Sequence, residues 1–240
     1  MTTLPGGVSV TRLRVYDWPA PDGVGRAGSG APHVHLASTV AFVVLGGTGA
    51  LHTLGSEGVV QHALRPGVVV TVQPGVVHRP VNDGDLDVLV VVSTAGLPEA
   101  GDAVLTFPPT ALTDTATYRA AATLPAGSDE QVAHAARVRR DLAVQGYRQL
   151  LEATAKVGAG AALRPFLDAA VRLVRPTVPH WQDVWSRTTF VESDTTAGVL
   201  EGLARGVAPH LETGRSHRLE ADPAPRRYGL CGRLETWSLR

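Results

Sequence analysis

Short valine-rich runs, each ended by residues that favour turns, fill roughly the first hundred residues of the chain and restrict its possible folds. Glycine, proline, asparagine and aspartate separate the runs, with clusters at 46–47 and 82–84 that we interpret as turns. A series of short strands is typical of an antiparallel sheet packed on both faces, either a closed barrel or a double-sheet roll. The predicted strands cover residues 8–18, 40–45, 50–54, 59–64, 68–72 and 86–92.

The pattern becomes helical after the proline pair at 108–109. Residues 128–131 have the sequence of a capping box, and apolar residues then recur at helical spacing until Gly158. This spacing predicts one helix of about 29 residues, ~43 Å long at 1.5 Å per residue. Two further helices are predicted, over residues 163–175 and from 194 or 195 to about 214.

These patterns divide the chain into three predicted parts. Residues 1–110 form a β-barrel, residues 111–225 form a helical region, and residues 226–240 form an extended segment that packs back on the barrel. The predicted fold class is therefore mainly β with an α-helical C-terminal region of about three helices and a returning strand. We interpret the glycine- and proline-rich segment 19–31 as a mobile loop, or else as a simple exposed connection.

Charge and composition exclude several classes of function. The 240 residues carry 22 basic and 22 acidic side chains, and no stretch gathers enough basic residues to bind a row of phosphates, so nucleic acid is not an expected partner. No window reaches the ~18 apolar residues of a membrane helix, and the N-terminus lacks the pattern of a signal peptide. The lone Cys231 has no partner for an internal disulfide and is assigned no role. Together these features predict a cytoplasmic protein without a membrane partner.

Three histidines have the spacing of a metal site. His33 and His35 are two residues apart at the start of a predicted strand, so their rings project from the same face. Such a pair chelates a metal when a third neutral donor completes the site, and His78, three residues after a Pro-Gly turn, is the candidate. We interpret the other histidines as exposed or hydrogen-bonded residues: His52, His62, His134, His180, His210 and His217.

Around the histidine pair the chain resembles the cupin superfamily. The first cupin motif contains His-x-His, a spacer of three or four residues, a glutamate, six residues and a glycine. Here His33 and His35 are followed at these spacings by Thr39 and Gly46, so that a threonine stands where the glutamate would be.

The second cupin motif is also present. It runs glycine, five residues, Pro-x-Gly, two residues, histidine, three residues and asparagine. Gly67, Pro74-Gly75, His78 and Asn82 match this spacing, with Gln73 in the place of the first proline. The resemblance covers residues 8 to about 95, roughly a third of the chain.

The resemblance implies a jelly-roll barrel whose lumen holds a metal on the motif histidines, here His33, His35 and His78. Three neutral imidazoles leave the charge of a divalent ion uncompensated, so up to three coordination sites face the cavity and favour anionic, bidentate substrates. The expected cofactor is one divalent transition metal, with Fe(II) ranked first, Zn second, and Ni, Mn or Cu as further imidazole-binding metals. Thr39 and Gln73 are candidates to hold the second ring nitrogens or to face a substrate, and each is equally a strand or turn residue.

Two classes of function fit this site. The first is a metal-dependent enzyme for a small anionic or chelating metabolite. Dioxygenase chemistry ranks first, because three-histidine iron cupins are associated with it, and isomerase or cyclase chemistry ranks second. The alternative is a non-catalytic module that binds or senses a small ligand through a degenerate metal site. The helical region is a candidate association element, and a homodimer is the expected assembly.

Overall fold

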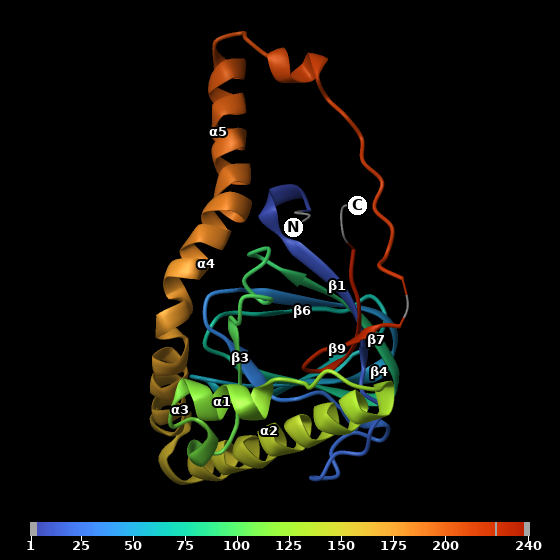
Figure 1. The fold of residues 1–240 in the computed structure, drawn as a ribbon, viewed down its shortest axis with the longest axis vertical. Helices are drawn as coiled ribbons and strands as arrows, with labels where there is room; N and C mark the ends of the chain where they lie inside the picture. Colours follow the sequence, from blue (N-terminus) through green and yellow to red (C-terminus); the bar gives the residue numbers. More distant parts are fainter. Residues whose placement is uncertain (1–3, 224, 238–240) are drawn as a thin grey trace.

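An antiparallel sheet of ten strands forms the body of the molecule within the described residues, 4–223 and 225–237, of the computed structural model (Figure 1). The strands are β1 (Ser9–Val15), β2 (Gly28–Ser29), β3 (His33–His35), β4 (Val40–Gly55), β5 (Gly58–Leu64), β6 (Val69–Val72), β7 (Val77–Val92), β8 (Ala103–Leu105), β9 (Arg227–Tyr228) and β10 (Gly232–Glu235). Their order is β5-β4-β7-β1-β10-β9, with β2 and β3 paired to β7, β6 to β4 and β8 to β3. The predicted fold class is confirmed.

The two longest strands, β4 and β7, correct the predicted turns. Gly46 and Gly47 lie inside β4, at shifts in its register against β7, and residues 82–84 lie inside β7. Gly47 has φ 72°, and a Cβ there would lie 2.2 Å from the carbonyl oxygen of Asp85, so the strands approach too closely for a side chain. The two runs predicted on either side of the glycine pair are therefore one bulged strand.

Inside the rolled sheet lies an apolar core. Its buried members come from strands distant in sequence, among them Leu13 of β1, Phe42 of β4, Leu64 of β5 and Val88 of β7. Alternate residues of β4 are buried from Val40 to Val44, as expected when one face of a strand packs inward. The valine-rich run predicted as a strand over residues 40–45 therefore buries one face in this core.

The α-helices of the described residues lie between β8 and β9 in the sequence. Those of eight residues or more are α1 (Thr115–Ala122), α2 (Asp129–Val157), α3 (Ala159–Val174), α4 (Val178–Trp185) and α5 (Val191–Ala204). Single turns of helix occupy Pro5–Gly7, Pro109–Ala111, Arg175–Thr177, Ser186–Phe190 and Pro209–Glu212. The predicted helices correspond to α2, α3 and α5, whereas the eight-residue α1 and α4 were not predicted because two turns give little periodic signal.

The long helix α2 agrees with its prediction in length and in both ends. It has 29 residues, its capping box joins Ser128 and Gln131, and it stops at Gly158, which has φ 83°. Together with α3 it shares a core with the sheet, in which Val34 of β3 and Tyr147 of α2 are buried. The back of the strand that carries the histidine pair therefore rests on this helical layer.

Beyond α4 the chain leaves the body and then returns to it. In Figure 1, α5 extends away from the sheet, and the chain after it runs back toward β9. No residue of α5 is buried, and the helix ends at Ala204, earlier than predicted. The predicted return is confirmed, because β10 pairs with β1; residues 238–240 of the predicted segment lie outside the described residues. None of the described helices combines the length and apolar composition that a bilayer crossing requires.

The segment 19–31, interpreted as a mobile loop or an exposed connection, is anchored at both ends. The fully buried Arg140 donates hydrogen bonds to the carbonyl oxygens of Trp18, Pro19 and Ser29. Arg79 also pairs with Asp22 and donates to Ser29 Oγ. These contacts argue against a mobile gate.

Candidate metal centre

Strand pairing places the three sequence-predicted histidines together. His33 and His35 lie on β3, with Val34 between them facing the apolar core behind. Because successive side chains of a strand point to opposite faces, both rings lie on the other side. His33 is directly opposite His78 of β7 in the antiparallel register. Residues 45 positions apart in sequence thus become neighbours through one strand pairing.

The three rings converge. Ring centroids are separated by 4.2 Å for His33 and His78, 5.3 Å for His33 and His35, and 5.7 Å for His35 and His78. One nitrogen from each ring lies within 4.8 Å of the others, and all three residues are buried. The cluster is compatible with a metal ion, since imidazole nitrogens about 2.0–2.1 Å from an ion are spaced within this limit.

Hydrogen bonds determine which ring nitrogens are free. His33 Nδ1 lies 2.9 Å from the carbonyl oxygen of Ala31, and His78 Nδ1 lies 3.1 Å from that of Val76. A carbonyl oxygen only accepts, so each Nδ1 carries the proton and each Nε2 keeps its lone pair for a ligand. His78 Nε2 is buried and has no hydrogen-bond partner among the described residues, which an ion between the rings would remedy.

Asp102, which the sequence did not reveal as a site residue, holds the third ring. Its fully buried carboxylate lies 3.0 Å from His35 Nδ1 and accepts backbone hydrogen bonds from Leu36, Ala37 and Ser38. Burial raises the pKa of Asp102, but the hydrogen bonds from His35 and Ser38 outweigh it and the net shift is downward. The carboxylate therefore stays ionised and fixes the His35 ring from behind.

Burial also keeps two of the rings neutral. It lowers the pKa of His33 to about 3, with the neighbouring His35 as the second cause. The pKa of His78 lies well below its ordinary value for the same reason, followed by the effects of His33 and His35. Neutral rings are the form that binds a metal, so at neutral pH these two side chains need not lose a proton to do so.

The roles predicted for Thr39 and Gln73 are not supported by their positions. Gln73 is exposed in a turn, where its carbonyl oxygen accepts from Val76 N, and the second ring nitrogens find other partners. The backbone N–H of Thr39 donates to Ser93 Oγ, and the carbonyl oxygen of Thr39 accepts from Ser93 N. The described residues that line the cavity around the histidines include Val40 but not Thr39. The four-residue form of the motif spacer puts Val40 at the carboxylate position.

Asn82 of the second motif has a structural role. Its Nδ2 donates to the carbonyl oxygen of Val15, and its Oδ1 accepts from Gly84 N and Leu86 N. These hydrogen bonds hold the irregular part of β7 and the end of β1 in place. Asn82 is not among the residues that line the cavity, and it stabilises the strand that presents His78.

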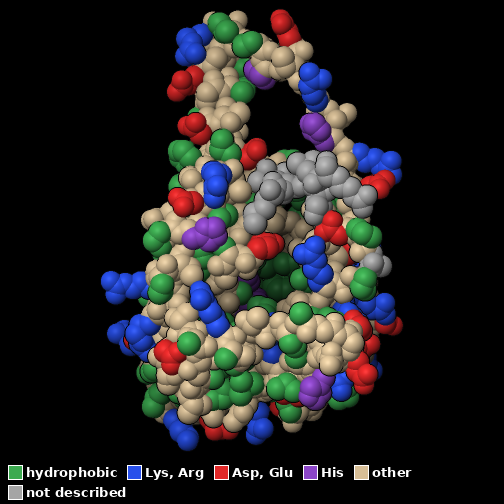
Figure 2. Space-filling view, in the orientation of Figure 1, with side chains coloured by type: hydrophobic (Ala, Val, Ile, Leu, Met, Phe, Trp, Pro, Cys, Tyr) green, Lys and Arg blue, Asp and Glu red, His purple; other side chains and the backbone are tan. Residues whose placement is uncertain are grey.

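A cavity of about 320 Å³ contains the three histidines. This is at the lower end of the range for small-molecule sites. In Figure 2 the face toward the viewer is hollowed near its centre, with hydrophobic side chains on the wall of the hollow. The other lining residues are Ser9, Thr11, Leu13, Val40, Phe42, Val90, Val92, Pro98, Glu99, Ala103, Arg139, Tyr228, Gly229, Leu230, Cys231 and Leu234.

Cys231 belongs to the cavity wall. Its Sγ lies 3.4 Å from the carbonyl oxygen of Ala31 and 3.7 Å from His33 Nδ1, the nitrogen that already has a carbonyl partner. Burial raises the pKa of Cys231 to about 12, so the side chain remains a thiol at neutral pH. The residue packs beside a candidate ligand and does not replace one.

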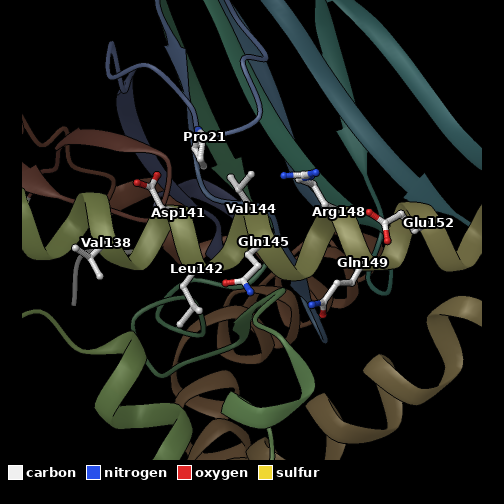
Figure 3. A pocket seen from close by; sticks show the side chains of 9 residues that line it. All are labelled: Pro21, Val138, Asp141, Leu142, Val144, Gln145, Arg148, Gln149 and Glu152. Carbon is white, nitrogen blue, oxygen red and sulfur yellow. The ribbon is translucent and has the colours of Figure 1, made fainter.

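A second pocket, of about 620 Å³, lies along α2 (Figure 3). Pro21 from the loop before β2 lies above Val144, and the charged side chains of Asp141, Arg148 and Glu152 line the pocket. No histidine or cysteine lines it. Among the described residues, the group of side chains that could hold a metal ion is that of His33, His35 and His78 in the rolled sheet.

The fold and the site define a jelly-roll β domain with a buried three-histidine cluster. Residues 24–94 match the family model of the Cupin domain, so the chain contains a cupin domain. No curated protein matches the chain at a significant level.

Solved structures similar to part of the chain are remote. The capsular polysaccharide assembling protein CapF from Staphylococcus aureus is 20% identical with a TM-score of 0.32, over 43% of this chain and 29% of that one. WlaRA, a TDP-fucose-3,4-ketoisomerase from Campylobacter jejuni, is 14% identical with a TM-score of 0.31, over 39% and 64% of the two chains. A cupin-2 domain protein from Shewanella frigidimarina is 18% identical with a TM-score of 0.26, over 35% and 69%.

Proposed function

We propose that His33, His35 and His78 bind one divalent transition metal, Fe(II) in first place, and that the cupin domain is a metal-dependent enzyme for a small anionic or chelating metabolite. The observation that carries this proposal is the buried Nε2 of His78, which has no partner among the described residues and belongs to a cluster whose ligand atoms lie within 4.8 Å of one another. Each of the three rings is oriented from behind by an oxygen at its Nδ1.

The metal would supply Lewis acidity or oxygen activation to a chelated substrate. The chain's own residues keep the rings of His33 and His78 neutral by burial and exclude water with an apolar wall that includes Val40 and Phe42. Isomerisation and cyclisation need a positioned general base. Glu99 is the carboxylate among the described lining residues and it is exposed, so we rank dioxygenase chemistry first and isomerase or cyclase chemistry second.

Elemental analysis tests the metal site. Purified wild-type protein should contain close to one equivalent of transition metal, and His78→Ala should reduce that content by about tenfold or more because one ligand of three is lost. His52→Ala is the matched control, since His52 also lies on a long strand of the sheet but does not line the cavity. Equal metal content in wild type and His78→Ala would refute the assignment.

Oxygen uptake tests the reaction. With 2,4-pentanedione as a chelating probe, the iron-loaded wild type should consume oxygen and the His78→Ala variant should not. A specific observation favours the alternative of a non-catalytic binding module: Val40, an apolar residue, lines the cavity at the motif's carboxylate position. Ligand binding that survives complete removal of the metal, without oxygen uptake, would favour that alternative.

A further inference from the structure

Three arginines are buried in the described part of the chain, and they differ in their counter-charges. Arg79 pairs with Asp22, and Arg140 pairs with Asp141, each with 2.5 Å between nitrogen and oxygen. Arg139 on α2 is 8% exposed, and it donates to two backbone carbonyl oxygens and lies beside the neutral phenol of Tyr16, with no carboxylate among these partners. A buried guanidinium without a carboxylate is costly unless another anion reaches it.

One nitrogen of the Arg139 guanidinium has no hydrogen-bond partner among the described residues. Nη1 donates to the carbonyl oxygen of Ala122 at 3.1 Å, and Nη2 donates to that of Gly229 at 2.6 Å. Nε is buried and has no hydrogen-bond partner among the described residues. Because a guanidinium pairs with a carboxylate through two neighbouring N–H groups, the free Nε marks the side at which an anion would bind.

Arg139 lines the same cavity as the three histidines. The C-terminal segment that returns to the sheet contacts both Arg139 and the histidine cluster. The carbonyl oxygen of Gly229 accepts a hydrogen bond from Arg139, and Cys231 Sγ lies 3.7 Å from His33 Nδ1. Apolar side chains such as Phe42 and Leu234 make up much of the remaining wall. A buried, incompletely paired cation and a histidine cluster thus share one largely apolar space.

We propose that Arg139 is an anion subsite in this cavity, which binds the carboxylate of a small organic acid while another part of the same molecule faces the three histidines. The second contact rests on the proposed function, whereas the carboxylate contact requires no metal. The apolar wall favours an acid with a hydrophobic body, and the unpaired guanidinium discriminates against the neutral analogue because that analogue leaves the cation buried without a counter-charge.

Calorimetry of metal-free protein tests the subsite, with 4-phenylbutyrate as probe and its neutral amide as reference. Wild type should bind the acid at least about tenfold more tightly than the amide, as expected for a hydrogen bond to a charged group. Arg139→Gln should remove this preference and retain metal binding. Arg137→Gln is the matched control on the same helix, because Arg137 stacks on Trp18 and does not line the cavity, and it should keep the preference.

A second readout covers the case in which Arg139→Gln fails to fold after losing its two carbonyl contacts. In ¹⁵N-labelled wild type the Arg139 Nε–H resonance, assigned by its absence in Arg139→Lys, should shift on addition of the acid and not of the amide. Equal binding of acid and amide by the wild type would overturn the subsite. A wild type that prefers the acid but binds no metal would instead refute the proposed function and leave the subsite intact.

Discussion

Replacing Asp102 by asparagine should weaken metal binding without touching a ligand. The carboxylate accepts a hydrogen bond from His35 Nδ1 at 3.0 Å, and the backbone N–H groups of residues 36–38 donate to its two oxygens. An asparagine has one acceptor oxygen and one NH₂ group, so it retains part of the backbone contacts but presents a donor where an acceptor is needed. If that NH₂ faces His35, the ring must accept at Nδ1 and move its proton to Nε2, the nitrogen that would bind the metal.

The expected loss of metal affinity in Asp102→Asn follows from the role of the Asp102 carboxylate as the hydrogen-bond partner of His35. Loss of a hydrogen-bonding partner behind a metal ligand typically reduces metal affinity by about 10- to 100-fold, or about 1.4 to 2.7 kcal/mol. The metal-free protein should also be less stable by about 1.5–3 kcal/mol, because charge-assisted hydrogen bonds in a buried site are lost.

Competition with a chromophoric zinc chelator measures the affinity, and two-dimensional ¹H–¹⁵N spectra of the imidazole nitrogens report the tautomer of His35. Asp87→Asn is the matched control, since Asp87 pairs with Arg12 at 2.7 Å on the sheet and does not line the cavity. An Asp102→Asn variant with wild-type affinity and an unprotonated His35 Nε2 would refute the reasoning.

Three further predictions concern stability and assembly. The pKa of His33 in the folded protein (about 3) lies below its value in the unfolded chain, so the metal-free protein should lose stability as the pH falls below about 6.5. The loss for this group should be up to ~1.4 kcal/mol per pH unit, and urea unfolding at several pH values measures it. Gly146→Ala should destabilise the protein by about 1–3 kcal/mol, because the new Cβ would lie 2.0 Å from the carbonyl oxygen of Thr106. This clash exceeds the ~1 kcal/mol gain in helix propensity, and a higher melting temperature for the variant would contradict the prediction. The homodimer stays a prediction, with α5 as the expected contact because Leu200 and Leu203 are 62% and 48% exposed. Replacing both leucines by glutamate should convert the dimer to a monomer, as measured by light scattering. An unchanged mass would exclude α5 as the contact.

The histidine cluster could be predicted because two of its members are close in sequence and the third lies at a fixed place in the second motif. His33 and His35 share a face through the two-residue period of β3, and the second motif fixes the place of His78. The turns at 46–47 and 82–84 were wrong for a physical reason: glycines that favour a turn also permit a bulge, and only the pairing of β4 with β7 decides between them.

Asp102 and Arg139 lay beyond the reach of the sequence because their environments arise from long-range packing. Asp102 precedes β8, a three-residue strand too short to give a pattern, and it meets His35 only because β8 pairs with β3. Arg139 reads as one more polar residue of an amphipathic helix, and its burial results from the return of the C-terminal segment over α2. No spacing rule links these residues to the histidines.

The charges around the cavity favour one kind of ligand. Asp102 is fully buried, but its oxygens are occupied by His35 and by backbone N–H groups behind the ring. A divalent ion on three neutral rings would therefore keep its charge on the cavity side, in the same space as the guanidinium of Arg139. Two cationic centres in a largely apolar space repel each other more strongly than in water. A ligand with negative charge at both ends relieves this repulsion and a neutral one does not, so metal loading should sharpen the cavity's preference for acids.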